Sequence, residues 1–356
     1  MKKLLKFVLC VLLALVVIVG AYFAYVFISY HRLGDNIPLA VTNKQTGEAQ
    51  ADQAYRIMSW NIGFGAYESD YGFFMDGGSE SWAWSEERLD ANLRSISDLV
   101  RDQGADFYII QEVDTDSTRS YHRDERVPLQ LALPDCGSIW AQNYDSPFLF
   151  YPLTQPHGRS VAGIMTFSPY AITSAVRREL PIEETVMKLV DLDRCYSVSR
   201  IPVANGRELV LYNMHLSAYT SDGTIANEQL RLLIADMQAE VEKGNYVVGG
   251  GDFNKDILGD SSAYFGKSDI EYTWAQPIPE GVFDGTGLQL VAPLDEANPV
   301  PSCRNADGPY HEGQYVLTID GFIVSDNVTV SASSVIDTQF AYSDHNPVEM
   351  TFTLEP

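Results

Sequence analysis

The sequence predicts an α/β fold: a four-layer sandwich of two packed mixed β-sheets flanked by helices, preceded by one N-terminal transmembrane helix. From residue 55 onward, strand-like apolar runs outnumber helical stretches and alternate with them. Hydrophobic residues make up 46% of the 356 residues and aromatic residues 12%, so the chain can bury a large core. The many Tyr and Phe residues favour strands packed face to face.

The amino terminus predicts a membrane anchor. Residues 1–6 carry three lysines, and residues 7–30 carry no charge, which is long enough to cross the roughly 30 Å hydrocarbon layer as a helix. Because only His31 and Arg32 follow the span, the positive-inside rule places the amino terminus in the cytoplasm and the rest outside the cell membrane. A cleaved signal peptide is the alternative, but its apolar core is usually about 7–15 residues and a small-residue cleavage site follows it, which we do not find near Ile28.

The polar residues 31–54 predict a linker without regular structure, and residues 55–356 predict one folded domain, which we expect to be a monomer. Beyond residue 30 there are 21 basic and 48 acidic residues, a net charge of −27. Such a surface repels polyanions and argues against tight nucleic-acid binding, although solubility alone also explains it. Cys136, Cys195 and Cys303 are too few for a disulfide framework, and a single bridge remains open.

Two helices and a series of strands are predicted within the domain. Residues 85–104 have apolar side chains at helical spacing, with Ser85 as the N-cap and Gly104 at the end. Residues 227–244 repeat that spacing and end at Gly244. The predicted strands cover residues 55–60, 106–114, 159–169, 170–180, 207–217, 246–254, 315–325, 328–336 and 346–355.

Polar side chains gather where these strands end or begin. They are Asn61, Glu112, His215, Asp252, Asn254, Asp320, Asp344 and His345. Because groups delivered by strand ends meet at one rim of a sheet, we expect a single site. A set of oxygen ligands with two imidazoles and no thiolate suits Mg²⁺, with Mn²⁺ or Ca²⁺ as alternatives, better than a structural zinc ion.

Six short motifs carry a family resemblance. MSWNIG, IIQEVD, YNMHLSA, GGGDFN, TIDGF and SDHNPV follow one another between Met58 and Val348. They resemble the successive motifs of the endonuclease/exonuclease/phosphatase superfamily, which includes pancreatic deoxyribonuclease, apurinic-site endonucleases, inositol polyphosphate phosphatases and neutral sphingomyelinases. Each motif alone is weakly specific, whereas six in order form a strong signal. The resemblance implies that residues 55–356 are the catalytic domain of a Mg²⁺-dependent hydrolase of phosphoester bonds.

The resemblance also implies roles for the acids and amides. Glu112 and Asn61 would hold the metal ion, and Asp344 would add charge at that position. Asp252 would orient and deprotonate the attacking water, and Asn254 would hold the nucleophile or a phosphate oxygen. Residues 252 and 254 share a face in an extended chain, so the intervening phenylalanine packs away from them. We expect the three preceding glycines to let the backbone pass closely beneath a phosphate centre.

The histidines resemble two further family residues. His345 would contact the scissile phosphate, and Asp320 would fix its tautomer and raise its basicity. His215 resembles a histidine of the deoxyribonuclease and sphingomyelinase branches, where it could stabilise or protonate the leaving oxygen. Gly63 stands where apurinic-site endonucleases have another acid, which argues against the DNA-repair branch.

Two other features are expected near the same rim. Arg119 and Arg159 are candidates for binding substrate phosphate, with surface salt bridges as the alternative for each. The aromatic residues 63–85 are open to three interpretations: a pocket wall, a lipid contact or a packed structural loop.

Together these observations favour a membrane-anchored, extracytoplasmic phosphoesterase that cleaves a phosphodiester or phosphomonoester by in-line attack of water. The acidic surface and the anchor favour a small or membrane-presented phosphoester, such as a phospholipid head group, over duplex DNA. One alternative is an extracellular deoxyribonuclease-like endonuclease. Another is a catalytically silent module that binds a phosphorylated ligand.

Overall fold

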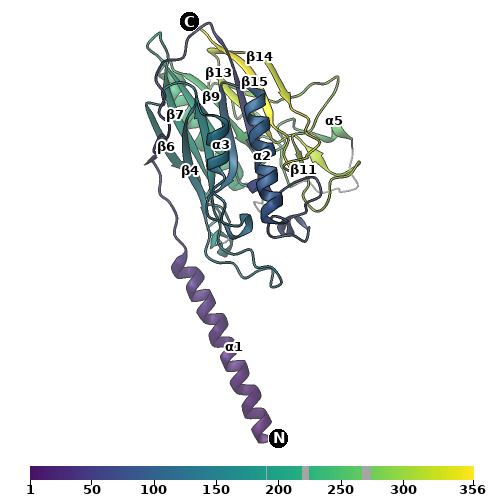
Figure 1. Cartoon of the computed structure of the whole chain (residues 1–356). Coiled ribbons are helices and arrows are strands. Elements are labelled where there is room, and N and C mark those ends of the chain that lie inside the picture. Colours follow the sequence, from purple (N-terminus) through teal and green to yellow (C-terminus); the bar gives the residue numbers. More distant parts are fainter. Residues whose placement is uncertain (190, 219–223, 267–273) are drawn as a thin grey trace.

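The computed structural model describes residues 1–189, 191–218, 224–266 and 274–356. A long helix, α1 (Lys2–Ser29), projects from a folded domain that holds two large β-sheets (Figure 1). One sheet has seven strands in the order β1-β6-β7-β8-β9-β13-β10, and the other has six in the order β14-β15-β2-β3-β5-β4. Because β2–β3 and β8–β9 are parallel pairs among antiparallel neighbours, both sheets are mixed, as predicted.

The strand bounds are as follows. The seven-stranded sheet contains β1 (Ile37–Pro38), β6 (Ser174–Glu179), β7 (Cys195–Pro202), β8 (Glu208–His215), β9 (Tyr246–Asp252), β13 (Asp320–Ser325) and β10 (Leu288–Val291). The six-stranded sheet contains β14 (Val328–Val335), β15 (Val348–Leu354), β2 (Ala54–Asn61), β3 (Phe107–Asp114), β5 (Val161–Ser168) and β4 (Gly137–Asp145). A separate pair consists of β11 (Cys303–Arg304) and β12 (Val316–Leu317).

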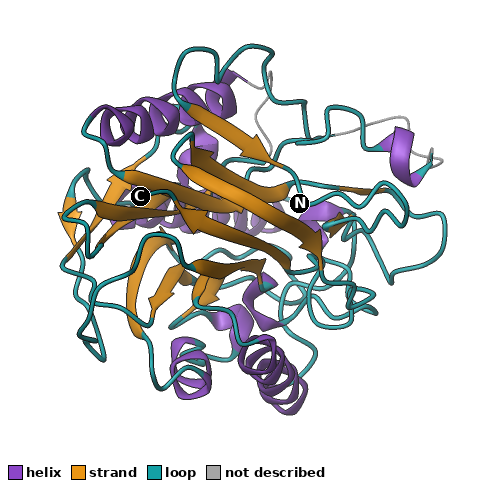
Figure 2. Ribbon diagram, turned by 90° about the horizontal axis from the view of Figure 1, so that it is seen from above, coloured by secondary structure: helices purple, strands orange, loops and turns teal. Residues whose placement is uncertain are grey.

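The domain has four layers, because helices cover the outer face of each sheet (Figure 2). One buried cluster, which includes Ile109 and Val248, joins the two sheets to each other. A second packs the six-stranded sheet against α2 (Glu86–Gln103) and α3 (Arg126–Ala132), and a third packs the seven-stranded sheet against α4 (Thr224–Glu242). The remaining helices are short: α5 (Ser262–Phe265), η1 (Gly63–Gly65), η2 (Phe74–Asp76), η3 (Thr118–Ser120) and η4 (Val186–Leu189).

The first predicted helix of the domain has the predicted ends. The Ser85 hydroxyl accepts a hydrogen bond from the Arg88 backbone N–H at 3.2 Å, which satisfies one free donor of the first turn of α2. Gly104 adopts a left-handed conformation with φ of 58° at the other end. In α4, the apolar face that includes Leu233 and Met237 packs into the core as the spacing predicted.

The α1 helix is 28 residues long, with a mean hydropathy of 2.9 over its most apolar window and no part of that window buried. Its length and composition suit either a single membrane span or a signal sequence.

The segment from Gly34 to Gln50 has more structure than its polar composition suggests. Its β1 strand pairs with β6, and Thr42 pairs with Ser138 of β4. Ala49 is fully buried in the core between the sheets. This part of the expected linker therefore lies against the domain instead of forming a free tether, because its few apolar side chains find partners on both sheets.

The three glycines of β9 allow neighbouring elements to pack closely against the strand, a role that the sequence did not predict. A Cβ atom at Gly249 would lie 2.2 Å from the Met237 Cε of α4, and one at Gly250 would lie 2.6 Å from a Phe322 ring carbon. At Gly251, with φ of 139°, a Cβ atom would lie 2.0 Å from the Met214 carbonyl oxygen. The close neighbours are therefore an outer helix and the two flanking strands.

The strands predicted over residues 159–169 and 170–180 end in different sheets, since β5 pairs with β3 and β4 whereas β6 pairs with β1 and β7. The turn between them carries the chain from one sheet to the other. Five strands among the described residues were not predicted from the sequence: β1, β4, β7, β10 and β11.

Candidate active site

Strand ends build a pocket at one rim of the sandwich. The parallel pairs β2–β3 and β8–β9 each bring two carboxyl-terminal ends together, and Asp320 begins β13 directly opposite Asp252 of β9. The resulting cavity has a volume of about 140 Å³. Seven of the ten predicted site residues line it: Glu112, Arg119, His215, Asp252, Asn254, Asp344 and His345.

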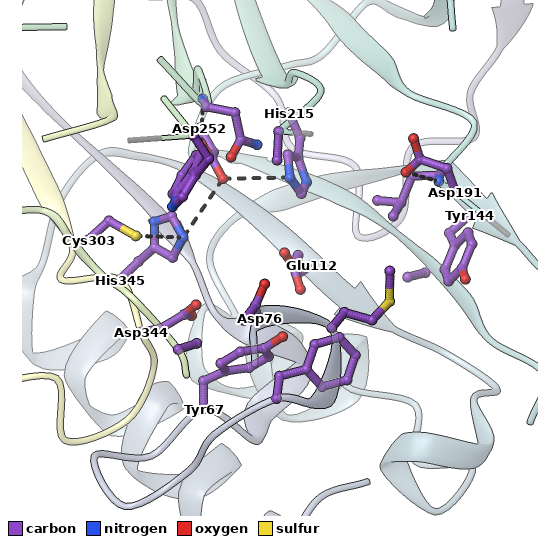
Figure 3. A pocket seen from close by; sticks show the side chains of 18 of the residues that line it. Tyr67, Asp76, Glu112, Tyr144, Asp191, His215, Asp252, Cys303, Asp344 and His345 are labelled. Atoms are coloured by element: carbon purple, nitrogen blue, oxygen red, sulfur yellow. Dashed lines mark hydrogen bonds and ion pairs between the residues drawn. The ribbon is translucent and has the colours of Figure 1, made fainter. Parts of the chain in front are cut away.

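Asp252 lies at the centre of the group, between the two histidines (Figure 3). Its Oδ2 is 3.6 Å from His215 Nε2 and 3.8 Å from His345 Nε2, and it accepts a hydrogen bond from Asn61 Nδ2 at 3.1 Å. Its Oδ1 accepts a hydrogen bond from the Asn254 backbone N–H at 2.8 Å. Burial raises the pKa of Asp252 to about 7, so this carboxylate can take up a proton near neutral pH.

His345 forms a buried pair with Asp320. The His345 Nδ1 and the Asp320 Oδ2 are 2.8 Å apart, and the same oxygen accepts a hydrogen bond from the Ser302 hydroxyl at 2.7 Å. Burial opposes a charge on the ring, but Asp320 outweighs it and holds the pKa of His345 well above its usual value. His345 is therefore positively charged, and its Nε2 faces the pocket beside Asp252.

His215 has the opposite charge state. Burial, together with the positive charges of Arg194 and His345, lowers the pKa of His215 well below its usual value, so the ring is neutral. The buried His215 Nδ1 has no hydrogen-bond partner among the residues that the structure describes.

Glu112 reaches the pocket because β3 is irregular at this point. The register between β3 and β5 shifts between Ile110 and Val113, and Glu112 adopts a left-handed conformation with φ of 54°. Such bulges redirect a side chain from its normal side of the sheet. The Glu112 Oε1 accepts a hydrogen bond from Asn61 Nδ2 at 3.2 Å, which ties this carboxylate to the amide that also holds Asp252.

Glu112 and Asp344 form an oxygen-rich wall of the pocket. Loss of hydration raises the pKa of Glu112, with Arg119 opposing the shift and Asp344 adding to it. Loss of hydration likewise raises the pKa of Asp344. Buried carboxylates whose charged forms are destabilised in this way favour a cation beside them.

The sequence profile of the Endonuclease/Exonuclease/phosphatase family matches residues 58–345. The chain belongs to this family. Family members are hydrolases that act on phosphoester bonds, and the chain is one of them. A search of curated protein sequences found no match.

Solved structures support the family fold. The chain is similar to an endonuclease/exonuclease/phosphatase from Beutenbergia cavernae DSM 12333, with a TM-score of 0.58 and 17% identity over 85% of this chain and 72% of the other. It is also similar to ANGEL2, a 2′,3′-cyclic phosphatase, in complex with adenosine-2′,3′-vanadate (TM-score 0.56, 17% identity, 90% and 99% covered). A third similar structure is the human Nocturnin catalytic domain with bound sulfate anion (TM-score 0.53, 17% identity, 89% and 97% covered).

The endonuclease/exonuclease/phosphatase domain contains a buried group compatible with a metal site. Ligand atoms of Asp252, Asp320 and His345 all lie within 4.8 Å of one another. Asp320 is already the hydrogen-bond partner of His345 and does not line the pocket, whereas Glu112 and Asp344 do. The carboxylate oxygens on the pocket side are also of the type that hard divalent cations prefer.

The two predicted arginines have different positions. Arg119 lines the pocket, and its guanidinium donates hydrogen bonds of 3.0 and 2.8 Å to Asp114 while lying 3.9 Å from the centroid of the Phe64 ring. Arg119 therefore supplies positive charge while Asp114 occupies the Nε–Nη2 edge of its guanidinium. Arg159 is not among the residues that line the pocket, and it pairs instead with Asp145 at 2.7 Å. A contact between Arg159 and substrate therefore stays a prediction.

Sequence reasoning missed Arg194. This residue lines the pocket and is buried, and its Nη1 donates to the Leu216 carbonyl at 2.9 Å. The same carbonyl accepts a hydrogen bond from Asn254 Nδ2 at 2.8 Å, so the arginine and the amide are held together. Arg194 Nε has no partner among the described residues. No motif marked Arg194, because it precedes β7, which the sequence did not predict as a strand.

The aromatic segment 63–85 packs as a structural loop and also forms part of the pocket wall. Phe64 and Tyr71 are fully buried beneath the six-stranded sheet, where they fill a core cluster. Tyr67, Phe73 and Met75 line the pocket. Two of the three interpretations left open by the sequence therefore hold at once.

Proposed function

We propose that the protein is a membrane-anchored, extracytoplasmic, Mg²⁺-dependent phosphoesterase that cleaves a small or lipid phosphoester by in-line attack of water. The observation that carries this proposal is the arrangement around Asp252, where a carboxylate with raised pKa lies between a cationic and a neutral histidine. General acid–base chemistry requires groups of different charge state around one reacting centre.

Asp252 is the proposed general base. It would orient the attacking water and accept its proton, and the Asn61 and Asn254 hydrogen bonds hold the carboxylate in one orientation for this task. Asn254 itself has φ of 48°, a left-handed conformation that asparagine tolerates better than most residues.

The histidines would act on the phosphate from two sides. His345, kept cationic by Asp320, would donate a hydrogen bond from Nε2 to a non-bridging oxygen. His215, being neutral, would stabilise the leaving oxygen by hydrogen bonding instead of protonating it. The sequence left open whether His215 stabilises or protonates the leaving oxygen, and its neutral charge state favours stabilisation.

The cationic arginines would bind the substrate phosphate. Arg194 has an unpaired Nε and lies beside Asn254, so we assign it the direct contact. Arg119 would act mainly through its charge, because Asp114 holds its guanidinium.

Glu112 and Asp344, with Asn61, would hold Mg²⁺, and Mn²⁺ or Ca²⁺ would suit the same oxygen donors. When bound, the ion neutralises negative charge that develops on the phosphate oxygens. The fit is supported by the raised pKa values of both carboxyl groups in a pocket they share.

The substrate class is proposed from the surface and from the similar proteins. ANGEL2 is a 2′,3′-cyclic phosphatase, and the Nocturnin domain holds a sulfate anion, so related folds accept compact anions. The net charge of −27 beyond residue 30 disfavours a long polyanion such as duplex DNA. The apolar α1 helix supports a single membrane span with the domain outside the cell.

A substrate screen tests the proposal. The full chain, purified in detergent, would be assayed on bis-para-nitrophenyl phosphate, sphingomyelin, phosphatidylinositol and plasmid DNA, first with Mg²⁺ and then with EDTA. We expect Mg²⁺-dependent hydrolysis of a small or lipid phosphoester that Asp252→Asn abolishes. Nicking of DNA alone would replace the proposal with a nuclease. Hydrolysis of none of these substrates, with metal binding retained, would indicate a silent binding module.

A further inference from the structure

The loop that joins β4 to β5 presents an uncharged apolar tip to solvent. Residues 146–158 contain no Asp, Glu, Lys or Arg. At the tip, the exposed fractions are 52% for Phe150, 69% for Tyr151 and 84% for Leu153. Soluble domains rarely leave several large apolar side chains exposed next to one another, so this surface suggests a partner.

The loop is held in this shape by its own backbone and by the aromatic segment. Leu149 and Gly158 exchange two backbone hydrogen bonds of 3.0 Å, which extend the β4–β5 ladder. Trp82 Nε1 donates to the Pro156 carbonyl at 2.8 Å. The apolar tip is therefore fixed in an exposed position by specific contacts.

The same loop contacts α1. Tyr22 Oη donates to the Phe148 carbonyl at 3.2 Å and accepts from the Phe150 backbone N–H at 3.2 Å, and the Tyr22 and Phe150 rings meet edge to face with centroids 5.3 Å apart. Tyr25 Oη accepts from the Phe148 backbone N–H at 3.0 Å. Tyr22 is two turns before Ser29, the last residue of α1, so the contact lies about 10 Å inside the end of the apolar helix.

On its other side the loop borders the candidate active site. The Phe74 ring packs on the Tyr151 ring with centroids 5.8 Å apart, and the neighbouring Met75 is 54% exposed and lines the pocket. His157, at the base of the loop, also lines the pocket. Aromatic contacts thus lead from α1 through Phe150 and Tyr151 to Phe74, which is next to the pocket residue Met75.

We propose that residues 147–153 insert into the lipid interface and turn the active-site pocket toward the lipid head groups. This inference rests on the proposed membrane span. Loop residues tied to α1 at the depth of Tyr22 would enter the boundary between head groups and acyl chains, where Tyr and Phe are favoured. The uncharged loop and the acidic domain fit a zwitterionic surface such as phosphatidylcholine better than an anionic one.

Depth-dependent quenching tests the insertion without relying on catalysis. Leu153→Cys would be labelled with a fluorescent probe in a Cys10→Ala, Cys136→Ser background, because Cys195 and Cys303 are buried. Leu131→Cys is the matched control, since Leu131 is 75% exposed but lies beside Ser138 at the opposite end of β4. The full chain would be reconstituted in phosphatidylcholine vesicles.

We expect the probe at residue 153 to lose fluorescence to lipids that carry a quencher high on the acyl chain and to resist aqueous iodide. The probe at residue 131 should show the reverse. Quenching of residue 153 by iodide but not by lipid would overturn the proposal. Protection of residue 153 from both quenchers would also overturn it, because a second copy of the chain would then cover the loop.

An activity measurement adds an independent test. Leu153→Ser should lower hydrolysis of a phosphoester lipid in vesicles and leave hydrolysis of soluble bis-para-nitrophenyl phosphate unchanged, whereas Leu131→Ser should change neither. Equal rates on vesicles for Leu153→Ser and the unmodified chain would contradict the proposal. If the unmodified chain hydrolysed none of the substrates, the proposed function would be refuted instead. The quenching result would still decide whether the loop inserts.

Discussion

Gly251→Ala offers a sharp test of how the candidate active site is held. The residue precedes Asp252, and its φ of 139° lies in a region that side chains with a Cβ atom rarely adopt. A Cβ atom would also lie 2.0 Å from the Met214 carbonyl oxygen, which belongs to the backbone of β8 and cannot rotate away. The two parallel strands that carry His215 and Asp252 would therefore have to separate.

The expected loss of stability follows from these two effects. Backbone strain of this kind costs about 1–3 kcal/mol, and forcing extra volume into a packed core costs about the same. We therefore expect a loss of about 4 kcal/mol in the free energy of unfolding. Since a domain of this size shifts by roughly 2 °C per kcal/mol, the melting temperature should fall by about 8 °C.

Gly249→Ala is the matched control. Its added Cβ atom would lie 2.2 Å from the Met237 Cε, which is the end of a flexible side chain that can move, and 2.9 Å from the Tyr212 Cβ. Its three nearest atoms all belong to side chains, whereas the nearest atom at Gly251 belongs to the backbone. We expect a loss of only about 1 kcal/mol, or about 2 °C. Thermal unfolding of both variants in the same detergent, with hydrolysis measured in parallel, makes the comparison. Equal shifts in melting temperature would refute the argument that contact with the β8 backbone makes Gly251 irreplaceable.

Four further predictions concern chemistry and pH. Asp320→Asn should lower kcat by about 10²–10³-fold with little change in KM, because it removes the charge that keeps His345 cationic. An unchanged pH–rate profile would contradict this role of Asp320. Arg194→Gln should raise KM about tenfold for an anionic phosphoester while the melting temperature stays constant. A lower kcat at constant KM would show that Arg194 does not act simply by binding the substrate. EDTA should stop hydrolysis, and Glu112→Gln should raise the Mg²⁺ concentration for half-maximal rate by about tenfold or more, as a metal titration would reveal. Burial, reinforced by the Arg119 charge, lowers the pKa of His157 to about 4. The neutral ring therefore contributes up to about 3 kcal/mol to the free energy of unfolding above pH 6.5, and this contribution is lost as the pH falls toward 4. Denaturant unfolding at pH 6.5 and pH 4 should show a smaller loss of unfolding free energy for His157→Gln than for the unmodified chain. An equal loss in both proteins would show that His157 is not the group responsible.

Sequence patterns predicted those parts of the fold that depend on local chemistry. The helix α2 follows from apolar spacing and from the chemistry of Ser85 and Gly104 at its ends, both of which act within a few residues. The strand β9 follows from its apolar run, yet the purpose of its glycines does not, because Met237 and Met214 approach from elements elsewhere in the chain. Which sheet a strand joins is likewise a long-range property, as β5 and β6 illustrate.

The candidate site was predicted where motifs mark strand ends. Asn61, His215 and Asp252 are the last residues of their strands. Glu112 lies near the end of β3 and His345 shortly before β15, and the five side chains meet as expected. Isolated arginines carry no such signal, because an arginine suits a surface salt bridge and a phosphate pocket equally well.

The contacts just after α1 and along β1 limit how far the domain can travel. Arg32 pairs with Glu179 at 2.8 Å and also donates to the Leu180 carbonyl, while His31 lies 3.1 Å from Asp145, so almost no slack separates the helix from the domain. A domain attached this closely cannot sweep through the surrounding medium to collect substrate. In a membrane-anchored enzyme, encounters would then be confined to molecules that diffuse laterally in the same leaflet, and turnover would depend on their surface density instead of their bulk concentration.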